Sequence, residues 1–143
     1  MTVVSAEDMH QLGLQLSGHL RAGDLIFING PLGAGKTVLA QGIGKGLGIN
    51  DVTSPTFVIS RVHNAPLPMI HVDAYRLLDA KNPKLHVDDL DLDIENSVTV
   101  IEWGGAESAG LSEDRLEITI DRSDEIRTVE ITCIGKRWAG FTL

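Results

Sequence analysis

A short apolar run followed at once by a glycine-rich stretch constrains the fold of this chain of 143 residues more than any other feature. The run is Leu-Ile-Phe-Ile at 25–28, and residues 30–37 read Gly-Pro-Leu-Gly-Ala-Gly-Lys-Thr, which fits the pattern G-x-x-x-x-G-K-[ST]. A strand, this loop and a helix in that order are typical of an α/β domain with a phosphate-binding P-loop. The alternative is an ordinary glycine-rich turn, and the preceding strand pattern argues against it. We call residues 30–37 the P-loop.

Three residue types at fixed offsets explain why this pattern binds phosphate. Gly30, Gly33 and Gly35 allow a positive φ, so that successive backbone N–H groups can surround an anion. Lys36 can reach the β- and γ-phosphates of a nucleotide, and the Thr37 hydroxyl is a hard oxygen ligand suited to Mg²⁺. The P-loop therefore predicts a site for a magnesium-bound nucleoside triphosphate.

A helix is predicted before the P-loop strand, and another directly after the loop. Ser5 and Asp8 resemble a capping box at the start of the first helix. Apolar residues recur at helical spacing in both segments, which predicts that each helix packs one face against a core. These apolar positions are Met9, Leu12, Leu16 and Leu20 in the first helix and Leu39, Ile43 and Leu47 in the second.

Strands are predicted in the rest of the chain. Residues 56–61, 69–72 and 98–101 are short and rich in β-branched residues. Residues 116–121 and 128–134 alternate with period two across a polar turn, which predicts an antiparallel hairpin. The sequence therefore predicts one domain over residues 1–143, with an α/β, P-loop NTPase-like three-layer fold, a mixed, mainly parallel central sheet and a C-terminal antiparallel hairpin.

Composition and charge limit which partners and which cellular location we expect for this chain. The formal net charge of −8 disfavours direct binding of a polyanion, so any nucleic acid should be held mainly by a partner, although solubility explains the acidity equally well. Cys133 is the only cysteine, which excludes an internal disulfide, and its alternating neighbours predict a buried strand position. Neither a signal pattern nor a membrane-length apolar stretch occurs, so we expect a cytoplasmic protein without membrane contact.

Two acidic residues stand where the predicted strands end. Asp73 follows the apolar run at 69–72 and Glu102 follows the run at 98–101. In a parallel sheet both would lie at the ligand-binding edge, where P-loop proteins need an acid to hold Mg²⁺ or to orient the attacking water. A polar cap at a strand end is the alternative for each acid alone. The stretch 54–57, Ser-Pro-Thr-Phe, offers hydroxyls that could reach the γ-phosphate or the metal, or a simple proline turn.

Taken together, four segments resemble the signatures of the bacterial TsaE family, also called YjeE. The segments are the P-loop, Ser54-Pro55-Thr56-Phe57, His71-Val72-Asp73-Ala74-Tyr75-Arg76-Leu77 and Ile101-Glu102-Trp103, in the family's order and spacing. The resemblance covers nearly the whole chain and implies a small ATPase that uses ATP and Mg²⁺. It also implies that the chain works with the TsaB and TsaD proteins and meets tRNA only through that complex. The complex places a threonylcarbamoyl group on the adenosine 3′ of the anticodon in tRNAs reading codons that begin with A.

The resemblance implies roles for single residues. Asp73 and Thr56 would support hydrolysis, and Thr37 and Glu102 would bind Mg²⁺, so that Glu102 also serves catalysis. The residues implied in nucleotide binding are Ser5, Gly33, Ala34, Gly35, Lys36, Thr37, Val38, Trp103 and Arg127. Alternatives remain for three of them: Ser5 can be a helix cap, Trp103 a core aromatic and Arg127 a partner in a surface ion pair.

The chain departs from the family pattern in two places, and other functions share some of its features. Pro31 stands where the family usually has Asp, and the segment 79–95 does not follow the pattern closely. A small-metabolite kinase would share the P-loop, but the 12 basic residues are scattered without an obvious lid. A non-catalytic, ATP-gated binding module is a third reading. A GTPase is disfavoured, because neither an N-K-x-D nor a D-x-x-G motif occurs.

Overall fold

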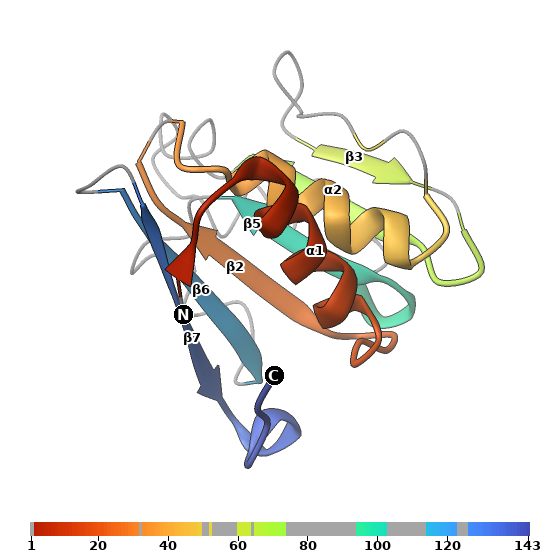
Figure 1. The fold of residues 1–143 in the computed structure, drawn as a ribbon. Helices are drawn as coiled ribbons and strands as arrows, with labels where there is room; N and C mark the ends of the chain where they lie inside the picture. The colour runs from red at the N-terminus through yellow and green to blue at the C-terminus, as the bar shows by residue number, and fades with distance from the viewer. Residues whose placement is uncertain are drawn as a thin grey trace, which may run out of the picture.

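A computed structural model describes residues 2–31, 33–49, 52, 60–63, 65–73, 94–102, 114–122 and 126–143. Its described residues form one mixed β-sheet with two helices side by side over one face (Figure 1). The strands are β1 Thr2–Val3, β2 Leu25–Asn29, β3 Ser60–His63, β4 Met69–Asp73, β5 Val98–Glu102, β6 Arg115–Asp121 and β7 Arg127–Ile134. The helices are α1 Ala6–Ser17 and α2 Lys36–Gly46, with short 3-10 helices η1 Ile94–Asn96 and η3 Lys136–Trp138.

The order of the strands is β1-β7-β6-β2-β5-β4-β3. The four central strands, β6, β2, β5 and β4, run parallel to one another, while β7 pairs antiparallel with β6, β1 with β7, and β3 with β4. The predicted mixed sheet and the C-terminal hairpin are therefore confirmed. The strand predicted at 56–61 is found only from Ser60 onward, and residues 53–59 lie outside the described part. The two-residue strand β1 was not predicted.

Apolar side chains are buried on both faces of the sheet. Ile26 and Ile28 of β2 and Val100 of β5 belong to the core beneath α1 and α2. Phe27 and Ile101 are 1% exposed, and alternation along their strands turns them to the opposite face. Near-continuous apolar strands are expected where a sheet is covered on both sides, and this pattern agrees with the predicted three-layer fold.

Helix α1 begins as the capping pattern predicts and then packs closely on α2. The Ser5 Oγ accepts a hydrogen bond from the backbone N–H of Asp8 at 3.1 Å. Gly13 and Gly42 lie where the two helices meet, and a Cβ on Gly13 would lie only 2.5 Å from the carbonyl oxygen of Leu39. The glycines therefore allow a close helix approach that fixes α2, and with it the end of the P-loop, against the core. No helix in the described ranges is both long and apolar enough to cross a membrane.

The predicted burial of Cys133 is wrong. Along one face of β7 the side chains pass from buried Val129 through half-buried Ile131 to exposed Cys133. Val129 belongs to the core cluster and Ile131 packs against it, but the cluster does not extend to the end of the strand. Period-two alternation indicates which face of a strand a residue lies on. It does not show how far the hydrophobic core extends over that face.

Candidate nucleotide site

The P-loop forms the turn between β2 and α2, at the carboxyl end of a central parallel strand (Figure 1). Gly33 has a φ of +78° and Gly35 a φ of +108°, so both need the left-handed freedom of glycine. Lys36 begins α2, and its Nζ donates to the Gly30 carbonyl oxygen at 2.6 Å. The loop thus joins a helix N-terminus to an ammonium group, and both favour an anion at this place.

Pro31 keeps the loop tight although it has no N–H. Its carbonyl oxygen accepts a hydrogen bond from the Ala34 N–H at 3.1 Å, which needs only the acceptor of Pro31. Ala34 is fully buried, and the half-buried Val38 packs against the core. Their side chains therefore anchor the loop, and contact of these two residues with a nucleotide stays a prediction.

Thr37 and Glu102, the two predicted metal ligands, are brought together by the fold. Thr37 Oγ1 donates to Glu102 Oε1 at 3.1 Å, although 65 positions separate them in the sequence. Neighbouring ligands of an octahedral Mg²⁺ lie about 2.9 Å apart, because each is about 2.0–2.1 Å from the ion. The two oxygens have nearly the spacing that such an ion requires, and both are of the hard type that Mg²⁺ prefers. The residues present therefore fit the ion.

His71 holds the other oxygen of the Glu102 carboxylate. Its Nε2 lies 2.5 Å from Glu102 Oε2, and the His71 side chain is fully buried. His71 and Glu102 lie on adjacent parallel strands, and His71 is paired with Val100, two residues before Glu102. No role was predicted for His71 from the sequence. The observed pairing of β4 with β5, together with the period of two along each strand, places it on the same face as Glu102.

Two arginines approach the P-loop from the β6–β7 hairpin. Arg122 Nη1 and Arg127 Nη2 both donate to the Gly33 carbonyl oxygen, at 3.3 and 3.2 Å. Arg127 was predicted to lie near the nucleotide, and the structure brings it to the P-loop. Arg122 was not singled out, and its only signal was its position across a polar turn from Arg127.

For the other predicted site residues, the structure describes only some positions and side chains. Asp73 ends β4 beside Glu102 in the register of the sheet, so both acids stand at the same sheet edge, but the Asp73 side chain lies outside the described part. Thr56 and Trp103 also lie outside it. Ser5 caps α1, and contact between Ser5 and a nucleotide stays a prediction.

A central parallel sheet with a P-loop after one strand, and with an acid at the end of the neighbouring strand, defines the class of P-loop NTPase-like folds. Residues 3–129 match the model of the family described as threonylcarbamoyl adenosine biosynthesis protein TsaE. The chain belongs to the TsaE family.

Relatives and a solved structure agree with this assignment. The tRNA threonylcarbamoyladenosine biosynthesis protein TsaE of Streptomyces coelicolor is 50% identical over 143 aligned positions, which cover 92% of this chain and 94% of that protein. The protein of the same name from Bacillus subtilis is 34% identical over 94% of this chain and 85% of its own length. The crystal structure of Bacillus subtilis YdiB matches with a TM-score of 0.78 and 29% identity, covering 97% of this chain and 87% of that one.

Proposed function

We propose that this chain is a weak, partner-stimulated ATPase that serves tRNA threonylcarbamoyladenosine biosynthesis in the cytoplasm. Hydrolysis of ATP would reset the TsaB–TsaD complex, which itself places the threonylcarbamoyl group on the adenosine 3′ of the anticodon. The chain would meet tRNA only through that complex, in keeping with its net charge of −8. The family match and the names of the relatives support the pathway.

The main evidence for ATP hydrolysis is the contact between Thr37 and Glu102 beside the P-loop. A hydroxyl and a carboxylate at 3.1 Å, next to a loop with the features of an anion site, suit a metal ion and a polyphosphate bound together. Mg²⁺ bound there would neutralise negative charge on the β- and γ-phosphate oxygens. Lys36 would add its ammonium charge, and the P-loop N–H groups would hold the phosphates in a fixed orientation.

Glu102 and Asp73 divide the acidic roles in this proposal. The Glu102 side chain is tied to Thr37 and His71, which orients it as a metal ligand. Asp73 stands beside Glu102 at the end of the next strand, where a carboxylate can orient a water molecule for attack on the γ-phosphate. Thr56, from the stretch 54–57, would assist this step.

Hydrolysis by the purified chain tests the proposal directly. We expect Lys36→Ala and Glu102→Gln to lower the rate of phosphate release about 100-fold or more, because each removes a charge that acts on the phosphates or the metal. Lys45→Ala is the control, since it removes the same charge from the exposed side of the same helix. Equal rates in all four proteins would show that the P-loop is not the site of hydrolysis.

A second measurement separates hydrolysis from simple binding. With purified TsaB, TsaD and tRNA, we expect ATP to support many rounds of modification per complex and a non-hydrolysable analogue to support only about one. Repeated rounds with the analogue would mean that the chain is an ATP-gated binding module. Transfer of phosphate to a small metabolite would instead favour a kinase.

A further inference from the structure

Arg122 and Arg127 place positive charge beside the P-loop. Both guanidinium groups bond to a single neutral oxygen, the Gly33 carbonyl. Within the described residues neither is paired with a carboxylate, although the chain carries 20 acidic and only 12 basic residues. Like charges that share one neutral acceptor repel each other weakly where they are exposed, and a bound anion would relieve that repulsion.

Most of the hydrogen-bonding capacity of the two arginines is also unused by the described residues. A guanidinium has five N–H donors, and within the described part of the chain each arginine makes one bond, in both cases to Gly33. Arg127 Nε is buried and has no hydrogen-bond partner in the described part of the chain. The forked arrangement of these donors fits the oxygens of a phosphate better than it fits one carbonyl.

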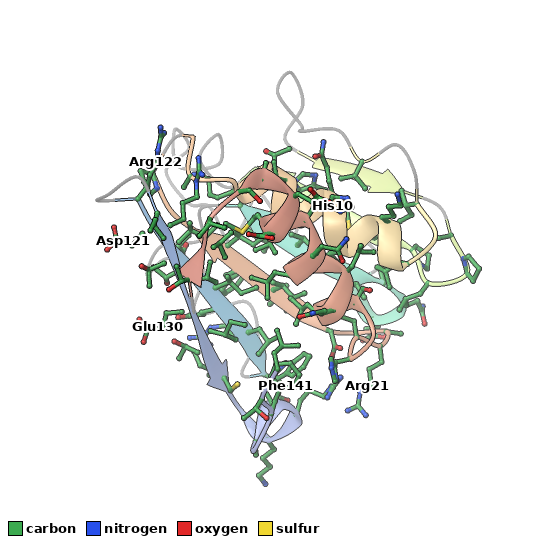
Figure 2. All side chains as sticks on the ribbon, in the orientation of Figure 1. His10, Arg21, Asp121, Arg122, Glu130 and Phe141 are labelled. Carbon is green, nitrogen blue, oxygen red and sulfur yellow. The ribbon has the colours of Figure 1, made fainter. Side chains whose placement is uncertain are left out.

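The Arg122 guanidinium lies close against Gly33. A Cβ at position 33 would lie 2.7 Å from Arg122 Nη1, which is the far end of a flexible, exposed side chain and could shift to avoid it. Gly33 is therefore required by its φ of +78° and not by the approach of Arg122. Figure 2 shows Arg122 at the end of the hairpin nearest the loop between β2 and α2.

The position of Lys36 indicates which phosphate the arginines face. In P-loop proteins this lysine reaches the β- and γ-phosphates, and here its ammonium lies against Gly30, at the start of the loop. Gly33 is exposed and precedes α2, whose N-terminus would face the inner phosphates of a bound nucleotide. We infer that the Arg122 guanidinium binds the terminal phosphate of a nucleoside triphosphate in the P-loop, with Arg127 beside it. This inference rests on the proposed function.

Arg122 then distinguishes ATP from ADP. The bond to Gly33 is exposed and long, so the side chain gains by exchanging a neutral acceptor for a charged one when a terminal phosphate is present. ADP lacks that phosphate and leaves Arg122 on Gly33. A chain that serves as a switch needs such a difference between its two nucleotide states.

Titration of the full chain with Mg²⁺ and either ADP or the imido analogue of ATP tests the inference. We expect Arg122→Ala to weaken binding of the analogue about 10-fold, as for loss of a charged hydrogen bond, and to change ADP binding less than about twofold. Arg122→Lys should recover part of the loss, because it keeps the charge and loses the fork. Lys136→Ala removes an exposed charge from η3 and should leave both affinities unchanged.

Each other outcome counts against the inference in a defined way. Equal weakening for both nucleotides would place Arg122 at the inner phosphates and overturn the terminal assignment. Unchanged binding of both, together with lost binding in Thr37→Ala, would overturn the role of Arg122 and leave the nucleotide site intact. If the unaltered chain binds neither nucleotide, the proposed function itself fails. Melting temperatures within about 2 °C of each other show that the variants fold, because Arg122 is exposed.

Discussion

The polar cluster before β2 and the polar cluster around the P-loop lie at opposite ends of the same strand, and they arrange their charges differently. In the first, which we call the Asp24 cluster, Arg137 donates to both carboxylate oxygens of Asp24 at 3.0 Å and to the His19 carbonyl at 2.8 Å. The same guanidinium lies 4.0 Å from the centre of the Trp138 ring. Asp24 is 4% exposed and also accepts from the Arg21 N–H at 2.7 Å.

At the P-loop the charges are kept apart. Glu102 contacts Thr37 and His71, and no arginine or lysine of the described residues reaches it. Arg122 and Arg127 lie at Gly33 instead of at an acid. In Figure 2, Arg122 marks this end of the sheet, while Arg21 and Phe141 mark the other.

The difference indicates what each cluster does. Charges that are matched within the chain, as in the Asp24 cluster, stabilise the fold by fixing η3 against the start of β2. Charges that have no partner of opposite sign among the described residues, as at the P-loop, contribute little to stability, and they favour a ligand that brings both signs. A metal ion with a polyphosphate is such a ligand, since the ion suits Glu102 and the phosphates suit the arginines.

The largest effect that we expect concerns the Asp24 cluster. Asp24→Ala should lower the free energy of unfolding by about 3 kcal/mol, because it leaves Arg137 without its buried partner. Affinity for nucleotide should stay within about twofold, since the cluster lies at the other end of the sheet. Urea denaturation measures the first quantity and nucleotide titration the second. Glu130→Ala, which removes an exposed acid, is the control; an equal loss in both variants would contradict a role for the ion pair.

A smaller effect is expected at His71. Removing its contact with the Glu102 carboxylate should lower the gain in nucleotide affinity that Mg²⁺ provides by about 10-fold, as for other groups that orient a metal ligand. The measurement is the nucleotide affinity of His71→Ala with Mg²⁺ divided by its affinity without Mg²⁺. Because both affinities come from the same protein, each variant serves as its own reference. His71→Gln, whose side-chain amide can still donate to Glu102, should recover most of it. A ratio unchanged in His71→Ala would mean that the histidine only fills the core.

The smallest effect tests whether a residue at the nucleotide end can serve stability alone. Ser5→Ala should cost about 1 kcal/mol of stability, because the Asp8 N–H loses its acceptor. Ser5→Asp, which can also cap a helix, should keep that stability. We expect nucleotide affinity to fall less than about twofold in both, since the hydroxyl is already used by the cap. A larger loss of affinity would favour the predicted contact between Ser5 and the nucleotide.

Features that depend on neighbouring residues were predictable from the sequence. The P-loop, the capped helix before it and the C-terminal hairpin each arise from local spacing or alternation, and all three were found. The two acids at strand ends were predictable as well, because parallel strands bring their carboxyl ends to one edge of the sheet. Their placement needed only the assumption that the sheet is parallel.

Features that depend on which distant segments meet were not predicted. The two residues of β1 carry too little pattern to mark a strand, and they form one only because β7 is beside them. The contact of Arg122 with Gly33 joins residues 89 positions apart, and no local pattern records it. The exposure of Cys133 likewise depends on where the core ends above β7.

By itself, the sequence determined that this chain has a phosphate-binding loop in an α/β fold, because glycine conformation, side-chain type and periodicity are local properties. Only the tertiary structure decided which side chains stand around that loop. It joined Thr37, Glu102 and His71 on one side and brought to the other two arginines that have no acidic partner among the described residues. The physical reason is that hydrogen bonds and ion pairs depend on distance in space, and sheet order and helix packing set that distance independently of separation along the chain.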